Sequence, residues 1–416
     1  MQRKMPELLV PAGDFEKLQM AVAYGADAVY LSGKQFSLRA NSKNFDNMDL
    51  KKAVEYAHAH NVKVYVAANI FAHNEDLSGL EEYLQELKDI RADAVIVSDL
   101  GVFDIARQIK GFEIHISTQA NVTNFQSALL YKNLGASRII LARELTFEDV
   151  RKINDEVADE TFQTEVFVHG AMCISYSGRC LLSSYMVGRD ANKGDCAHPC
   201  RWSYSLVEEF RPGEYFPVTE TERGTYIMNS KDLCLVGHIK ELVESGVSSL
   251  KIEGRMKSAY YVAVTTKIYR EALDDFFESE DLYYSKIDYY INELCKVSHR
   301  DFYTGFFVQS SGGEQTYKTN ITDSTHEYSG LVVAYDEASG CAVVEQRNKY
   351  SVGDEVEFIK SKHSQVIEEM YNENGSRVES SPHPQERIYV KVNGPVEKFD
   401  IMRKAVRKLD SLSNLP

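Results

Sequence analysis

The chain has 416 residues, of which 44% are hydrophobic and 26% charged, and its formal net charge is -15. This composition excludes a mainly disordered chain, and no apolar stretch reaches the roughly 18 residues of a membrane-spanning helix. The acidic excess argues against diffuse, salt-driven binding of nucleic acid, although a local basic patch remains compatible with it. The N-terminus has no apolar run of signal-peptide length, so we expect a cytoplasmic protein whose seven cysteines are thiols or metal ligands rather than disulfides.

One pattern repeats through the first 275 residues: a short apolar run, a polar end and an amphipathic stretch. The apolar runs occupy residues 7–10, 28–31, 62–67, 94–97, 113–116, 138–141, 165–168 and 249–252. Short apolar runs that alternate with helical patterns indicate parallel strands with crossover helices, and eight units fit a barrel of ordinary size. The sequence therefore predicts an α/β fold with a TIM-like (β/α)8 barrel.

Several helices of this barrel carry readable end signals. Asp14 is a good N-cap for a helix that Gly25 ends, and a long helix is expected over Ser258–Phe277 with an extension to about Ser298. The segment Lys231–Ser245 also has a helical pattern, which would put Cys234 on an apolar helix face.

The regular pattern breaks once, and then changes character near residue 300. Between the seventh and eighth apolar runs lies a segment far longer than an ordinary loop, and we expect a cysteine-containing insertion at about residues 170–228. We therefore expect a catalytic domain over residues 1–299 and a small C-terminal β-barrel or sandwich over residues 300–416. The runs that predict its strands are residues 328–333, 341–345, 355–359 and 387–391.

Polar side chains follow nearly every predicted barrel strand. In this fold the C-terminal ends of the strands form the active-site face, so these side chains should converge there. Arg39, Arg143 and Arg255 would make the face cationic and suited to a carboxylate or phosphate, unless they pair with nearby acidic residues such as Glu253.

Four further roles at this face follow from strand position alone. His169 and Glu253 are candidates for proton transfer, together with Arg255 as a catalytic group. Asn69 and Gln119 are candidates for contacts to a base or co-substrate, beside Arg143.

The cysteines give the most distinct signal. Cys173, Cys180, Cys196 and Cys200 follow the spacing C-x6-C-x15-C-x3-C in loops that contain glycine. Four thiolates in such loops can hold an iron–sulfur cluster or a zinc ion. The C-x2-C pairs of many zinc sites are absent, which favours a cluster, and Cys234 is a substitute ligand. The alternative is four buried, inert thiols.

Several segments resemble peptidase family U32. EVFVHGAMCISYSGRCLLS at residues 165–183 closely resembles that family's signature. Similar segments are ELLVPAGDFEKLQMAVAYGADAVYL at 7–31, STQANVTN at 117–124 and KIEGRMKS at 251–258. The likeness runs from about residue 5 to 275, and the tail resembles the family's C-terminal β domain.

Within that family, the chain most resembles the prephenate-dependent tRNA uridine hydroxylation proteins. The resemblance implies a 4Fe-4S cluster on the four cysteines, a tRNA partner and a prephenate-like anionic co-substrate. It also implies conversion of a wobble uridine to 5-hydroxyuridine, and it leaves a paralogous partner subunit open. The net charge fits tRNA binding poorly, so a local basic surface near Lys251, Arg255 and Lys257 is expected.

Two other functions remain open at this point. The family name implies a collagenase-like peptidase, a hydrolase that would need no iron, but no Ser–His–Asp set, signature Cys–His pair or zinc-protease helix is recognisable. A zinc-stabilised RNA-binding protein without catalysis is the third reading, with zinc in place of the cluster.

Overall fold

The structure is a computed structural model. It describes residues 4–34, 36–37, 44–172, 231–308 and 324–406, with residues 183, 187, 189, 196, 197, 199, 219–221 and 224–226. The chain divides into two compact units, one of Met1–Ile291 with His299–Thr322 and one of Asn292–Ser298 with Asp323–Pro416. The predicted domain boundary at residue 300 and the insertion at 170–228 stay predictions, and most of that insertion lies outside the described residues.

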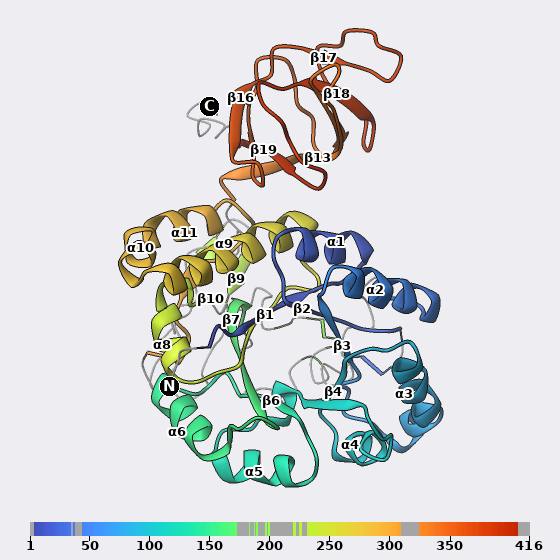
Figure 1. Ribbon diagram of the computed structural model, residues 1–416, viewed down its shortest axis with the longest axis vertical. Coiled ribbons are helices and arrows are strands. Elements are labelled where there is room, and N and C mark those ends of the chain that lie inside the picture. Colours follow the sequence, from blue (N-terminus) through green and yellow to red (C-terminus); the bar gives the residue numbers. More distant parts are fainter. Residues whose placement is uncertain are drawn as a thin grey trace. The chain divides into compact units, whose positions relative to one another are not determined.

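Eight parallel strands close the first unit into a barrel, which confirms the predicted fold (Figure 1). Each strand pairs with its neighbours in the order β11-β1-β2-β3-β4-β5-β6-β7, and β11 pairs with β7 to close the ring. The strands are β1 (Glu7–Pro11), β2 (Ala28–Leu31), β3 (Lys63–Ala67), β4 (Ala94–Val97), β5 (Glu113–Ile116), β6 (Arg138–Ile140), β7 (Gln163–Ala171) and β11 (Ser249–Ile252). All eight coincide with the apolar runs of the sequence.

Helices surround this barrel on the outside (Figure 1). They are α1 (Phe15–Ala23), α2 (Asn47–Ala59), α3 (Leu80–Asp89), α4 (Leu100–Ala106), α5 (Phe125–Asn133), α6 (Phe147–Val157), α8 (Ile239–Glu244) and α9 (Ala259–Glu278), followed by α10 (Glu280–Ser285) and α11 (Ile287–Leu294). The expected Asp14 cap is confirmed, because its carboxylate accepts from Lys17 N. The Ser258 hydroxyl caps α9 in the same way by accepting from Tyr261 N. No helix in the described ranges is long and apolar enough to cross a membrane.

The helix expected over Lys231–Ser245 is wrong in its first half. Residues Asp232–Cys234 form strand β10, which pairs antiparallel with the end of β7 and parallel with β12 (Phe302–Tyr303). A 3-10 turn then leads into α8. Strand β7 extends past its barrel neighbours to Ala171, and β10 pairs with this overhang. An apolar run this short does not show from its periodicity whether it is helix or strand.

The interior of the barrel contains a buried ionic network in place of an all-aliphatic core. Arg138 Nη1 lies 2.6 Å from Glu7 Oε1 and 3.1 Å from Glu165 Oε2. Lys251 Nζ lies 2.8 Å from the other Glu165 oxygen. Tyr65 Oη donates to Glu7 at 2.7 Å, and Arg138 is 3% exposed and Lys251 4% exposed. The two cations and two carboxylates therefore neutralise each other inside the barrel.

This network fixes the charge state of its members. Burial alone would raise the pKa of the Glu165 carboxyl, but Lys251 and Arg138 outweigh burial and hold that pKa below its usual value. Burial lowers the pKa of His115, and the nearby Arg138 lowers it further. His115 therefore stays neutral beside the network.

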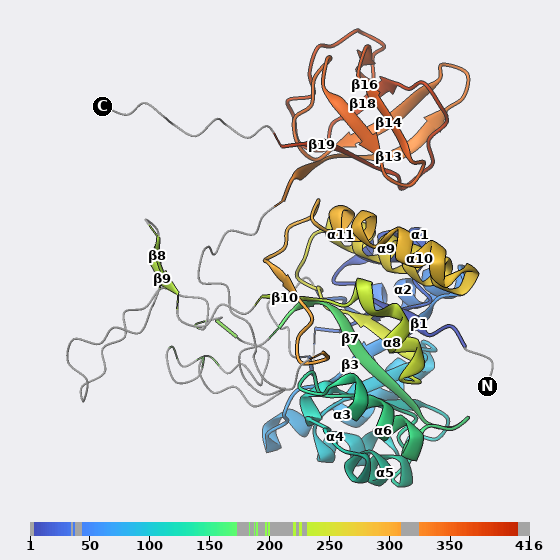
Figure 2. The same ribbon diagram turned by 90° about the vertical axis from the view of Figure 1, so that its left-hand side faces the viewer.

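The second unit is an antiparallel sheet that curls around one apolar core (Figure 2). Its order is β16-β15-β19-β13-β14-β18-β17. The strands are β13 (His326–Asp336), β14 (Cys341–Gln346), β15 (Glu355–Phe358), β16 (His363–Val366), β17 (Met370–Tyr371), β18 (Arg387–Lys391) and β19 (Ile401–Ala405). The four expected runs became β13, β14, β15 and β18, and strands β16, β17 and β19 were missed. The alternating pattern of β19 is masked by the basic pair Arg403 and Lys404.

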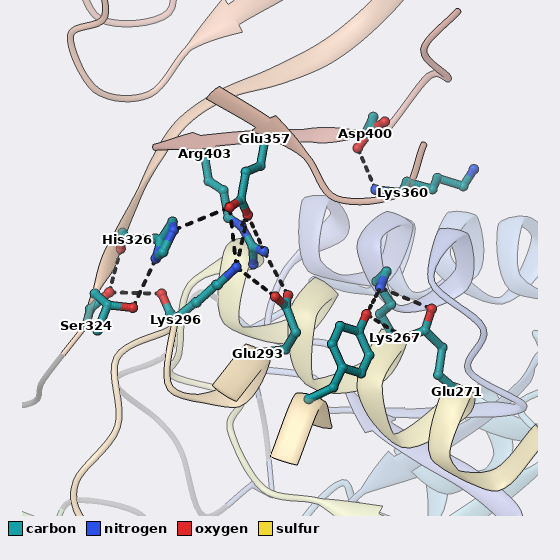
Figure 3. Close-up of polar contacts among 12 residues, drawn as sticks. Lys267, Glu271, Glu293, Lys296, Ser324, His326, Glu357, Lys360, Asp400 and Arg403 are labelled. Carbon is teal, nitrogen blue, oxygen red and sulfur yellow. Dashed lines mark hydrogen bonds and ion pairs between the residues drawn. The ribbon is translucent and has the colours of Figure 1, made fainter. Parts of the chain in front are cut away.

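Arg403 of β19 is buried, and neighbouring carboxylates balance its charge (Figure 3). Its guanidinium contacts Glu357 at 2.6 Å and Glu293 at 2.8 Å, and Lys296 contacts both carboxylates. The hydrogen bond with His326 is the largest influence on the pKa of Glu357, and it lowers that pKa. Burial raises the pKa, but Arg403 lowers it further, so the pKa stays below its usual range. The segment Asn292–Ser298 is thus tied to the sheet of its own unit by ion pairs.

The buried network predicts a large cost for removing its central carboxylate. Glu165→Leu leaves Arg138 and Lys251 buried with too little negative charge, so the free energy of unfolding should fall by about 3–5 kcal/mol. Urea unfolding followed by circular dichroism measures this change. Glu148→Gln, which breaks only the exposed Glu148–Lys152 pair, is the matched control and should leave the midpoint unchanged. Equal behaviour of the two variants would contradict the account.

Candidate active site at the barrel mouth

The candidate site is the face where the C-terminal ends of the eight parallel strands meet, which we call the barrel mouth. The strand-end residues of β1, β2 and β11 form one half, and those of β3, β5 and β6 form the other. These two halves differ in how their polar groups are satisfied.

In the first half, the polar groups hold one another. Arg255 is 6% exposed, and its Nη1 donates to the hydroxyls of Ser32 and Ser37. Tyr30 Oη donates to Glu253 Oε2 at 3.1 Å and to the Ile252 carbonyl at 3.0 Å. Arg255 and Glu253 therefore have defined protein partners, and Tyr30 positions the Glu253 carboxylate.

A close backbone approach fixes this half further. A Cβ atom at Gly13 would lie 2.2 Å from the Arg255 carbonyl oxygen. The loop after β1 can therefore approach the loop after β11 this closely only because residue 13 is glycine. Lys17 Nζ donates to the same carbonyl at 3.2 Å. The loop after β1 and the KIEGRMKS segment at residues 251–258 are thus in direct contact.

His169 lies at the end of β7, outside the interior of the barrel. The register between β11 and β7 shifts between Lys251 and Ile252, and this irregularity turns His169 away from the side on which Glu165 lies. Its ring centroid lies 5.5 Å from that of Tyr269 on α9 and 5.5 Å from that of Phe302. Burial lowers the pKa of His169 to about 3. Its proton-transfer role stays a prediction, and its contacts are those of a neutral packing residue.

In the second half, several buried polar atoms lack partners among the described residues. Asn69 Nδ2 donates to Ser117 Oγ at 3.4 Å, and the same hydroxyl accepts from Gln119 N at 3.2 Å. Asn69 Oδ1, Gln119 Oε1 and Asn121 Oδ1 are buried atoms with no hydrogen-bond partner within the part of the chain described. Such atoms are uncommon in folded proteins, because each unsatisfied group costs about 1–3 kcal/mol.

Arg143 belongs to this unsatisfied half. Its Nη1 donates to the Ala171 carbonyl at 3.3 Å, and its guanidinium lies 5.6 Å from the Phe167 ring centroid. Its Nε is buried without a partner, and among the described residues no carboxylate pairs with it. The acidic residue Asp99 instead caps α4 by accepting from Gly101 N and Val102 N. Arg143 is therefore placed to bind an anion or a carbonyl oxygen.

Most of the expected metal ligands fall where the structure gives no description. Cys173, Cys180 and Cys200 lie outside the described residues, as does Arg39, and Cys196 is partly buried. Within the described residues, no group of three His, Cys, Asp or Glu side chains is placed to hold a metal. Cys234 is partly buried on β10, opposite His169 in the register with β7. Four thiols suit an iron–sulfur cluster in kind, and the cysteine assignment stays a prediction.

The basic surface expected near Lys251, Arg255 and Lys257 is wrong for its first two members. Lys251 is buried in the ionic network and Arg255 is buried against Ser32, so neither side chain is available to an RNA backbone. Period-two alternation in β11 could have placed Lys251 inside the barrel, because Ser249 and Lys251 share one face.

Sequence reasoning missed two residues of the mouth. Tyr30 lies within an apolar strand and looked like core, while Asn121 lies in the STQANVTN segment without a distinctive spacing. Asn121 adopts a left-handed conformation with φ 53°. Asparagine tolerates this conformation better than most residues, so its presence in a predicted loop was the available signal.

Comparison with known proteins agrees with this architecture. The model of Peptidase family U32 matches residues 13–317, and that of the Peptidase family U32 C-terminal domain matches residues 324–403. The chain is 38% identical over 406 residues to tRNA hydroxylation protein P1 of Bacillus subtilis, covering 96% of this chain and 95% of that protein. It is 40% identical over 405 residues to an uncharacterized protease of Methanocaldococcus jannaschii, covering 95% and 97%. It is 35% identical over 420 residues to tRNA hydroxylation protein P of Escherichia coli, covering 91% of each.

The chain therefore belongs to peptidase family U32, and it carries both the barrel domain and the C-terminal domain of that family. The resemblance of the sequence to this family is confirmed.

The buried, neutral His169 predicts a pH-dependent stability. The pKa of this side chain is about 6.5 in the unfolded chain and about 3 in the folded chain. Between these values only the unfolded state binds the proton, so stability falls as pH falls from 6.5, by at most about 1.4 kcal/mol per pH unit.

His169→Phe keeps an aromatic ring among Tyr269 and Phe302 but removes the titration, so its stability should decline less steeply between about pH 6.5 and 4.5. Unfolding free energies measured across this range test the prediction, with the exposed His60→Phe as control. Parallel slopes for wild type and His169→Phe would contradict it.

Proposed function

We propose that this chain is an enzyme that hydroxylates a base of tRNA. Its similarity to two tRNA hydroxylation proteins over more than nine-tenths of the chain carries this proposal. Three amide oxygens and Arg143 Nε at the barrel mouth lack partners among the described residues, and they support the proposal because they suit an uncharged polar base and an anionic group.

We further propose that the target is a wobble uridine, which becomes 5-hydroxyuridine, with a prephenate-type anion as co-substrate. Replacement of the C5–H bond by C5–OH is a two-electron oxidation of the base, so a redox-active group and an oxygen donor are required. A 4Fe-4S cluster held by Cys173, Cys180, Cys196 and Cys200, with Cys234 as a substitute ligand, would supply electron-transfer chemistry.

The described residues would then have separate tasks. Arg143 binds a carboxylate of the co-substrate, since its guanidinium has no competing carboxylate among the described residues. Glu253, held by Tyr30 Oη, accepts the proton that leaves the base at C5. Arg255 shapes the mouth through Ser32 and Ser37 rather than by direct chemistry. Any paralogous subunit would add contacts to the RNA.

Peptide hydrolysis is the second candidate, because one relative with near-complete coverage is named as a protease. His169 lies near the end of β7, and among the described residues its ring contacts are with Tyr261, Tyr269 and Phe302. This arrangement disfavours hydrolysis by a serine or cysteine triad at the mouth.

Deletion of the gene tests the proposed function. Nucleosides released from the tRNA of the deletion strain should lack 5-hydroxyuridine and its derivatives by mass spectrometry. A plasmid copy should restore them, and Cys173→Ala should not, whereas Cys295→Ala should, because Cys295 is outside the proposed ligand set. Anaerobically purified wild type and Cys295→Ala should hold about four irons, and Cys173→Ala fewer. Unchanged tRNA nucleosides together with hydrolysis of collagen-like peptides would establish the second candidate instead.

The anion-binding role of Arg143 predicts a defect specific to the co-substrate. Arg143→Met removes the guanidinium and should raise KM for the anionic co-substrate by roughly tenfold or more, because charged hydrogen bonds contribute about 1.5–3 kcal/mol. Arg107→Met, which breaks only an exposed pair with Asp104, is the matched control. Steady-state kinetics at varied co-substrate concentration measure the effect, and an unaltered KM in Arg143→Met would refute the assignment.

A further inference from the structure

We propose that Asn69, Gln119 and Asn121 together read the edge of the target base, and that they select an imide edge, an N–H flanked by two carbonyl groups as in uracil. This inference rests on the proposed function and deepens it, because it assigns the residues that distinguish the base. Asn121 is a binding residue that strand position alone did not indicate.

The contrast between the two halves of the mouth locates the base. Tyr30, Glu253 and Arg255 have protein partners in the first half. In the second half, three side-chain amides each have a buried oxygen without a partner among the described residues. A fold retains such a cluster at a cost of about 1–3 kcal/mol for each atom unless a ligand satisfies it.

The loop that carries Gln119 and Asn121 is held in place by hydrogen bonds within the loop and to the segment after β6. Thr118 Oγ1 donates to the Leu141 carbonyl at 3.1 Å, which ties the loop to the end of β6. Asn121 N donates to the Thr118 carbonyl at 2.9 Å, and Ala142 N donates to the Val122 carbonyl at 3.1 Å. The side chains of Gln119 and Asn121 are thus the unsatisfied part of an otherwise satisfied loop, as in a preorganised binding site.

The chemistry of an amide matches an imide. Each amide offers one carbonyl acceptor beside an NH2 donor, so one amide can accept from N3–H of uracil and donate to an adjacent carbonyl. A second amide can donate to the other carbonyl. The set carries no charge, so it suits a neutral base rather than a phosphate or carboxylate, which Arg143 is better placed to bind.

The sharpest probe is an anticodon stem-loop RNA with either uridine or 3-methyluridine at the target position. The methyl group replaces the N3–H donor and leaves C5 unchanged. Wild type should bind and convert the uridine RNA roughly 5- to 150-fold better than the 3-methyluridine RNA, because a bidentate contact discriminates by about 1–3 kcal/mol.

Two variants then connect this preference to the proposed residues. Gln119→Leu or Asn121→Gly, whichever removes the oxygen that accepts from N3–H, should lose most of the discrimination, and glycine keeps the left-handed conformation of residue 121 without strain. Asn133→Leu, at the exposed end of α5, is the matched control and should retain it. Unfolding midpoints equal to wild type show that the variants are folded.

The outcomes separate the inference from the function. Conversion of both RNAs at equal rates by wild type would overturn the inference and leave hydroxylation intact, with ordered water as the partner of the amides. Discrimination that persists in both variants would also overturn it. Failure of wild type to convert any RNA would overturn the proposed function, and the inference with it.

Discussion

The mutual neutralisation of Glu7, Arg138, Glu165 and Lys251 inside the barrel is the constraint on which the mouth depends. A (β/α)8 barrel is usually filled by branched apolar side chains, which tolerate small shifts. Ions in a dry interior do not, because each buried charge is stable only at hydrogen-bonding distance from its partner. The Glu165–Lys251 pair therefore holds β7 against β11. Strand β7 also carries Phe167, whose ring contacts Lys251, and Glu253 directly follows β11.

Above this network, the mouth combines a rigid half with a receptive half. Tyr30 connects the rigid half to the interior of the barrel. Lys251 Nζ lies 4.5 Å from the Tyr30 ring centroid, and the Tyr30 hydroxyl donates to Glu253. The carboxylate is thus fixed before any ligand arrives. The residues that follow β3, β5 and β6 keep buried atoms without partners among the described residues, and these atoms are available to a substrate. Arg138, Lys251 and Arg255 are held by protein partners inside the fold, whereas Arg143 keeps a buried nitrogen without a partner among the described residues.

Most of the fold could be predicted from the sequence, because eight apolar runs at regular spacing allow few other arrangements. The site was harder. Strand position correctly brought Asn69, Gln119, Arg143, Glu253 and Arg255 to one face, but it could not show which of them were already satisfied by Ser32, Ser37 or Tyr30. The irregularity between β11 and β7 reverses the direction of His169, and no residue pattern announces it. Lys251 looked like a surface cation because sequence alone does not reveal a buried partner eighty-six positions away.

The account's central claim is that a uridine base binds against the unsatisfied half of the mouth. A crystal structure of the chain with a uridine-containing anticodon stem-loop tests this most directly. The account predicts that the imide edge of the base lies within hydrogen-bonding distance of Asn69, Gln119 or Asn121, with C5 toward Glu253. A base bound elsewhere, with ordered water filling the hydrogen-bonding positions of these three amides, would contradict it.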